Sequence, residues 1–510
     1  MIRTNYRSLL LNGLGNSSAF AVSLVVSLVL APIVLHAIGD ARYGAWSFTE
    51  SFIAYLTLFD FGIAAALVRF TPRCLTQNDD AQLNRFYSAS LTVFLFGGVL
   101  SAVLGFAFEM LFLDRCLRSP DLSWEFRWLF RLLVCNFAFS LSMSAYSAML
   151  DGLGRFALKG GVRTALLVAR VPLTLAAIRQ DNPLLALGVV LTACTVLECI
   201  VLALATMYLI PTLKYRPFSV DRATLRQVAG YSRHAFTAMI AGRLSFHTDA
   251  FVIAPILGPA AITVFSIPSR LVELSKALLR SATTPLTATF SALEARDDRT
   301  SLRATFMTAS RMAWYAALPL EAGLLLLGYP FLSIWVGPHY AELCMPLLIV
   351  LAWPLSLTIS QSVASRVLYG GGDLRNFARA TMAEGLSNLV LSIALIFPAG
   401  IVGVALGTAL PHAIFCIWVI NYVCRKLNVG AREYLMAVIK PALAVTIPVT
   451  VWAGLARRGI DSWFTLFNAG AAGLGAYAVA VAILELATIR RIRMRPGKSL
   501  LSLSDLRPSG

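Results

Sequence analysis

Apolar runs of roughly 18 to 25 residues recur along the sequence from Leu14 to Thr488, with short polar breaks between them. Runs of this length cross a hydrocarbon core about 30 Å thick when they are helical. The composition agrees, because 58% of the residues are hydrophobic, only 14% are charged, and the mean hydropathy is +0.74. The sequence therefore predicts an all-α polytopic membrane protein.

We predict about fourteen transmembrane helices from these runs. The first run is too long for the apolar part of a signal peptide, so it is expected to remain as the first span. The expected spans are 14–37, 44–68, 87–113, 128–150, 164–179, 184–210, 235–257, 261–287, 306–335, 345–368, 378–398, 400–423, 435–456 and 464–488.

Basic residues are distributed unevenly between alternate breaks. The formal charge is +17. Basic residues in the breaks on the side of the N-terminus outnumber those in the opposite breaks by about four to one. Because cytoplasmic loops of membrane proteins carry the excess of Lys and Arg, both termini are expected in the cytoplasm. The basic run IRRIRMRPGK at 489–498 is then a juxtamembrane anchor, and no nucleic-acid partner is expected.

The second half of the sequence repeats the first at a spacing of about 219 residues. LGPAAITVFSIPSRLVEL at 257–274 aligns with IGDARYGAWSFTESFIAYL at 38–56. SRVLYGGGDLRN at 365–376 aligns with SAMLDGLGRFAL at 147–158 at nearly the same spacing. An even number of spans in each half gives both halves the same orientation, which predicts two six-helix lobes in parallel repeat around a cavity.

The expected domains follow from this repeat. They are an N-lobe with spans 1–6 at 1–210, a cytoplasmic interfacial linker at 211–234, a C-lobe with spans 7–12 at 235–424, two extra C-terminal helices at 425–488, and a basic cytoplasmic tail at 489–510.

Four charged residues fall within the eighth span, namely Arg270, Glu273, Lys276 and Arg280. Their spacing confines them to about a third of the helix circumference. A cation facing lipid near the bilayer centre costs about 2.5 to 3.5 kcal/mol, so this face is expected to look into protein or water. Glu273 could instead pair with Arg270 and Lys276 along the helix, although an excess of positive charge would remain.

Charged residues of spans 2 and 7 complete the candidate site. We predict a cationic substrate-binding cavity formed by Arg243, Arg270, Lys276 and Arg280, with snorkelling of Arg243 to the membrane surface as the alternative. The candidates for ion coupling or for internal pairing are Asp60, His247, Asp249 and Glu273.

The eight cysteines are scattered and no CxxC motif or Cys/His cluster occurs. We therefore expect no metal site and no cofactor, and we predict no catalytic residues. A disulfide between Cys116 and Cys344 stays open, because both fall in breaks predicted to face outwards.

Several segments together resemble a known family. LNGLGNSSAFAVSLVVSLVLAPIVLHAIGDARYGAW at 11–46, LFDFGIAAALVRF at 58–70 and the Gly-x-Gly turns at 152–154 and 370–372 are similar to the polysaccharide or oligosaccharide-lipid flippases. These flippases belong to the multidrug/oligosaccharidyl-lipid/polysaccharide (MOP) exporter superfamily. The resemblance covers nearly the whole chain.

That resemblance implies a bacterial inner-membrane protein with twelve core spans, often followed by two more. Such proteins move a polyprenyl-pyrophosphate-linked oligosaccharide to the outer leaflet by alternating access, for exopolysaccharide or O-antigen biosynthesis, and are not enzymes. The implied partners are the lipid-linked glycan and membrane lipids, with a polysaccharide polymerase and chain-length proteins as candidates.

Two other function classes remain alternatives. A cation-coupled multidrug antiporter would require carboxylates to dominate the cavity, and a membrane glycan polymerase or ligase would require larger outer loops.

Overall fold

The computed structural model describes residues 6–113, 123–215, 226, 236, 248–456 and 459–493. Within these ranges the chain is helical and contains no strand. It divides into two compact units, one formed by Met1–Leu274 and Leu374–Phe415 and the other by Ser275–Asp373 and Cys416–Gly510. The domain boundaries predicted from the repeat stay a prediction.

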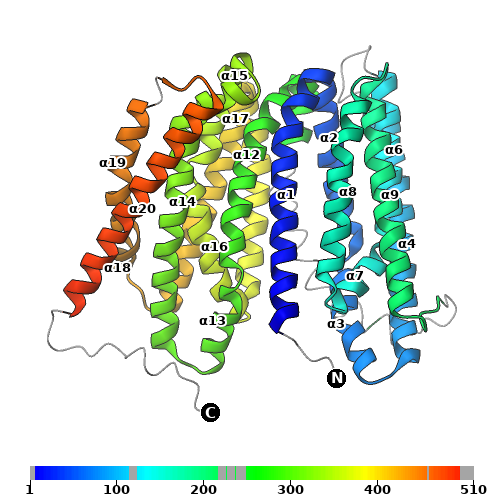
Figure 1. Cartoon of the computed structure of the whole chain (residues 1–510), viewed down its shortest axis with the longest axis horizontal. Coiled ribbons are helices and arrows are strands. Elements are labelled where there is room, and N and C mark those ends of the chain that lie inside the picture. The colour runs from blue at the N-terminus through cyan, green and yellow to red at the C-terminus, as the bar shows by residue number, and fades with distance from the viewer. Residues whose placement is uncertain are drawn as a thin grey trace. The chain divides into compact units, whose positions relative to one another are not determined.

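The first unit holds the helices that carry the candidate site. Helix α8 packs against both α1 and α9, and α6 packs against α4 and α9, as Figure 1 shows. The bounds are α1 (Tyr6–Ile38), α2 (Asp40–Leu56), η1 (Thr57–Asp60), α3 (Ile63–Thr76), α4 (Asp80–Phe108), η2 (Glu109–Leu113), α6 (Ser123–Ser142), α7 (Ser144–Gly152), α8 (Phe156–Ala177), α9 (Pro183–Leu209) and α11 (Asp249–Leu257).

The second unit is built around one long helix, α14, which packs against α15, α16 and α19. Helices α12 (Pro259–Thr283) and α17 (Leu374–Lys426) contribute residues to both units. The remaining bounds are α13 (Leu286–Ala295), α14 (Arg299–Trp335), α15 (Pro338–Ala352), α16 (Leu355–Gly370), α18 (Ala431–Tyr434), η5 (Leu435–Ile439), α19 (Lys440–Ala456) and α20 (Trp463–Arg493).

Among the described residues, seven helices are long and apolar enough to cross a membrane, or nine when each of two bent pairs counts as one span. Non-helical backbone at Gly400 divides α17 into two helices, near the predicted boundary between spans 378–398 and 400–423. Most of span 235–257 lies outside the described residues. The exact number of fourteen therefore stays a prediction.

Backbone conformations recur at the spacing of the sequence repeat. Gly39, before α2, has φ 79° and ψ 169°, and Gly258, before α12, has φ 85° and ψ 173°. Asn78 and Asp297 likewise share a left-handed conformation, with φ 52° and 51°. Each pair is separated by about 219 residues. The two halves of the sequence therefore begin equivalent helices in the same way.

Aspartates cap two of these equivalent helices. The carboxylate of Asp79 accepts a hydrogen bond from the backbone N–H of Gln82 (2.8 Å) at the start of α4. The carboxylate of Asp298 accepts one from the N–H of Ser301 (2.9 Å) at the start of α14. These contacts satisfy N–H groups that have no partner within the helix. Hydrogen bonds from the Ser301 side chain and from its backbone N–H hold the pKa of Asp298 below its usual value.

Replacing Asp298 by alanine should lower the free energy of unfolding by about 1 kcal/mol, because the N–H of Ser301 loses its acceptor. Denaturant unfolding of the purified protein in detergent measures this change. Asp79→Ala should show a similar loss, whereas Asp298→Asn should lose less because it keeps an acceptor oxygen. Full stability of both alanine variants would contradict the capping role.

Candidate functional site

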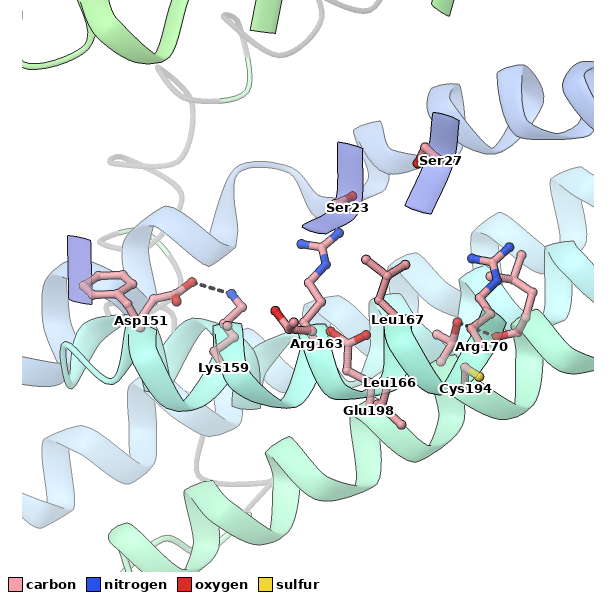
Figure 2. Close-up of a pocket in the computed structure, with 15 residues that line it drawn as sticks. Ser23, Ser27, Asp151, Lys159, Arg163, Leu166, Leu167, Arg170, Cys194 and Glu198 are labelled. Atoms are coloured by element: carbon pink, nitrogen blue, oxygen red, sulfur yellow. Dashed lines mark hydrogen bonds and ion pairs between the residues drawn. The ribbon is translucent and has the colours of Figure 1, made fainter. Parts of the chain in front are cut away.

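Three basic residues lie along one face of α8. Lys159, Arg163 and Arg170 are separated by four and then seven residues, which confines them to about 40° of the helix circumference. They span about 16 Å along the helix axis. Figure 2 shows the three side chains leaving α8 on the same side, towards the segment of α1 that carries Ser23 and Ser27.

These basic residues line a cavity of about 700 Å³ between α1, α8 and α9 of the first unit. This volume is within the range of about 300 to 1,000 Å³ that is typical of ligand pockets. Basic side chains outnumber the two acidic ones, Asp151 and Glu198. The remaining polar lining comes from Ser23, Ser27, Thr164, Cys194 and Thr195.

The guanidinium groups of the cavity are available to a ligand. Lys159 Nζ donates to Asp151 Oδ2 at 2.7 Å, so this ammonium group already has a counter-ion. Arg163 and Arg170 make no hydrogen bond or ion pair with the part of the chain that the structure describes. A guanidinium presents paired N–H donors that match the oxygens of a phosphate or carboxylate. The cavity can therefore bind an anion.

A second charged group lies between α2 and α12 of the same unit. Arg270 forms an ion pair with Glu50 on α2, and its guanidinium carbon lies 5.6 Å from the centre of the Tyr43 ring. The indole N–H of Trp46 donates to the other oxygen of Glu50 at 2.8 Å. The carboxylate of Glu50 thus has one donor on each of its oxygens.

Comparison with known proteins identifies the family. The family model for "Polysaccharide biosynthesis protein" matches residues 9–292, more than half of the chain. The chain belongs to the polysaccharide biosynthesis protein family. This family member is also similar to the uncharacterized membrane protein EpsK of Bacillus subtilis (strain 168), with 23% identity over 483 residues that cover 92% of this chain and 94% of EpsK.

Solved structures show which fold this polysaccharide biosynthesis protein has. The lipid II flippase MurJ in an inward closed conformation matches with a TM-score of 0.72 and 15% identity, over 95% of this chain and all of that chain. An inward-facing multidrug resistance MATE family transporter of the MOP superfamily matches with a TM-score of 0.66 and 15% identity, over 79% and 94% of the two chains. The fold is therefore that of the MOP-superfamily transporters, in a multi-pass membrane protein.

The structure of this family member describes some of the predicted site residues but not others. Arg270 is paired with Glu50, a carboxylate on another helix. Glu273 is exposed, Lys276 is buried and Arg280 is half-buried. Arg270 and Glu273 belong to the first unit, but Lys276 and Arg280 belong to the second. A joint site of these charges therefore stays a prediction. Arg243, His247 and Cys116 lie outside the described residues.

Asp60 has a local structural role in the bend of the second predicted span. Its Oδ1 accepts a hydrogen bond from the N–H of Ala64 (3.2 Å) in the first turn of α3. Phe61 and Gly62, which follow it, have positive φ angles of 51° and 73°. The chain bends by 46° at this break. The carboxylate thus accepts a hydrogen bond from a backbone N–H at the start of a helix, where such groups lack a partner within the helix.

Asp249 lies in a buried polar cluster of the first unit. Its Oδ1 accepts a hydrogen bond from Thr408 Oγ1 at 3.0 Å. One helical turn from Thr408, the ring of His412 contacts Glu384 across the two halves of α17, with 2.5 Å between Nδ1 and Oε1. Asp249, Glu384 and His412 are all less than a tenth exposed. Buried ionisable groups of this kind are candidates for ion coupling.

The apolar runs do not reveal the cavity residues of α8. They predict a span that begins at residue 164 and leave Lys159 and Arg163 in a cytoplasmic break, whereas α8 begins at Phe156. Arg170 lies within the expected span but is not among the predicted site residues. The signal was the shared helical face of the three basic residues, which becomes visible once the helix is extended towards its N-terminus.

Proposed function

We propose that this protein moves a polyprenyl-pyrophosphate-linked oligosaccharide across the bacterial inner membrane by alternating access, with both termini in the cytoplasm. The expected pathway is exopolysaccharide or O-antigen biosynthesis. Membership of the polysaccharide biosynthesis protein family supports a glycan as part of the transported substrate. A fold shared with a protein named lipid II flippase supports a lipid-linked substrate.

The observation that carries this proposal is the cavity with the two available guanidinium groups of Arg163 and Arg170. A pyrophosphate cannot cross hydrocarbon without replacement of its hydration. Charge-assisted hydrogen bonds from fixed guanidinium groups provide that replacement. The polar side chains of α1 and α9 offer further hydrogen bonds to sugar hydroxyl groups. Arg270 and Asp249 remain our candidates for substrate binding and ion coupling, respectively.

A liposome assay tests this function directly. The full-length protein is reconstituted with a fluorescent polyprenyl-pyrophosphate oligosaccharide, and a membrane-impermeant quencher reports the fraction of fluorophore in the outer leaflet. We expect the protein to make the inner-leaflet fraction accessible to the quencher. Accessibility no greater than in protein-free liposomes, with correctly folded protein, would exclude the proposed activity for that glycan.

The buried cluster around Asp249 favours a second function, a cation-coupled antiporter of small molecules. The fold shared with a MATE family transporter is consistent with it, and the paired side chains of Glu384 and His412 are candidates for the coupling site. The same liposomes distinguish the two functions. Uptake of a cationic dye driven by a pH gradient, without movement of the glycolipid, would favour the antiporter. We expect glycolipid movement without dye uptake.

A further inference from the structure

Glu50 occupies a defined position on α2, with one hydrogen-bond donor on each carboxylate oxygen. Trp46 Nε1 donates to Oε1, and Arg270 Nη2 donates to Oε2. Tyr43 and Trp46 lie on the same helical face as Glu50, at positions −7 and −4 relative to it. The ring of Tyr43 holds the guanidinium of Arg270 by a cation–π contact. The ion pair is therefore aligned by two aromatic side chains of α2.

This ion pair is accessible despite its position within a predicted span. The side chain of Glu50 is 46% exposed and that of Arg270 is 38% exposed. Ion pairs this open contribute little to stability. A ligand that offers a stronger anion can therefore compete with Glu50 for Arg270 at a small cost.

Glu50 occupies a position that a phosphate oxygen can take. Its carboxylate pairs with the guanidinium of Arg270 of α12. A carboxylate and a phosphate bind a guanidinium through the same pair of oxygen acceptors. A phosphate that reaches Arg270 therefore takes the place of Glu50.

We propose that Glu50 is an internal counter-ion, which the pyrophosphate of the substrate displaces from Arg270. This inference rests on the proposed function and names a specificity residue of the same site. A pyrophosphate carries more negative charge than one carboxylate, so it displaces Glu50, whereas a monocarboxylate gains too little. Glu50 thus selects for multiply charged headgroups. It also limits affinity, because it competes with the substrate for Arg270.

Binding of inorganic pyrophosphate to the purified full-length protein tests this inference. Glu50→Gln removes the competing charge and keeps an acceptor for Trp46. The dissociation constant for pyrophosphate should fall by about fivefold, the equivalent of about 1 kcal/mol, the upper end of what an exposed ion pair contributes. Acetate, which should not compete with pyrophosphate in the wild type, should begin to compete in Glu50→Gln.

Glu125→Gln is the matched control for this experiment. Glu125 pairs with Arg42 through two hydrogen bonds of 2.8 and 3.2 Å and does not line the cavity. Its replacement removes the same charge from an Arg–Glu pair of the same unit. The dissociation constant for pyrophosphate should stay at the wild-type value in this variant.

A fluorescence measurement tests the same inference without altering Glu50. Displacement of Glu50 by pyrophosphate should change the surroundings of the Trp46 indole. The difference in emission between wild-type protein and Trp46→Phe should therefore respond to pyrophosphate. Pyrophosphate binding without that response, or unchanged or weaker binding in Glu50→Gln, would overturn the role of Glu50 and leave the proposed function intact. Absence of any pyrophosphate binding to the wild type would overturn both.

Discussion

Replacing Arg170 by alanine should weaken the binding of inorganic pyrophosphate by about 10- to 100-fold. Arg170 lines the cavity and has no hydrogen-bond or ion-pair partner among the described residues. A hydrogen bond to a charged group contributes about 1.5 to 3 kcal/mol, and alanine removes every donor of the guanidinium. Isothermal titration calorimetry on the purified protein measures the dissociation constant. The rate of glycolipid movement in liposomes should fall with it.

Two further variants separate charge from geometry at this position. Arg155→Ala removes an equal charge just before α8, at an exposed residue that does not line the cavity. It should bind pyrophosphate like the wild type. Arg170→Lys keeps the charge but loses the paired donors, so its affinity should be intermediate. Wild-type affinity in Arg170→Ala would show that the cavity of α8 is not the anion site.

The helical fold could be predicted from the sequence because each span carries its own signal. A run of apolar residues long enough to cross the bilayer needs no knowledge of its neighbours. The apolar runs did not predict where helices start, because the expected spans begin at residues 87 and 306, whereas α4 and α14 begin at Asp80 and Arg299, directly after the capping residues Asp79 and Asp298. The number of spans was harder to predict. Two consecutive helices such as α2 and α3 can form one bent span, and composition alone does not show where such a bend lies.

The candidate site was only partly predictable, for a physical reason. Arg270 was selected because a cation within a span is costly and therefore informative. Its partner Glu50 is 220 residues away in the sequence, and no local pattern connects the two. Helical periodicity relates residues of one helix only, so it predicts Glu273, in the same helix, as a partner of Arg270. The ion pair between α2 and α12 becomes visible only in the three-dimensional structure, where the two helices pack together.

Replacing Gly44 by alanine should lower the free energy of unfolding by about 3 kcal/mol, towards the upper end of the usual cost of overpacking. A Cβ atom at Gly44 would lie 1.8 Å from the carbonyl oxygen of Pro259, in the first turn of α12. Thr263 Oγ1 donates to the carbonyl of Asp40 (2.7 Å) and holds the two helices at this close approach. The clash is with backbone, so a side-chain rotation cannot relieve it.

The sign of this effect makes the prediction specific. Within a helix, Gly→Ala normally stabilises by about 0.5 to 1 kcal/mol, because glycine loses more backbone entropy on folding. Gly470→Ala in α20, where a Cβ would meet no atom within 4 Å, should show that ordinary gain. Denaturant unfolding of both variants in the same detergent compares them. Since Tyr43 and Glu50 share α2 with Gly44, a displaced α2 should also weaken the pairing of Glu50 with Arg270. A Gly44→Ala variant as stable as the wild type would mean that α2 and α12 do not pack this closely.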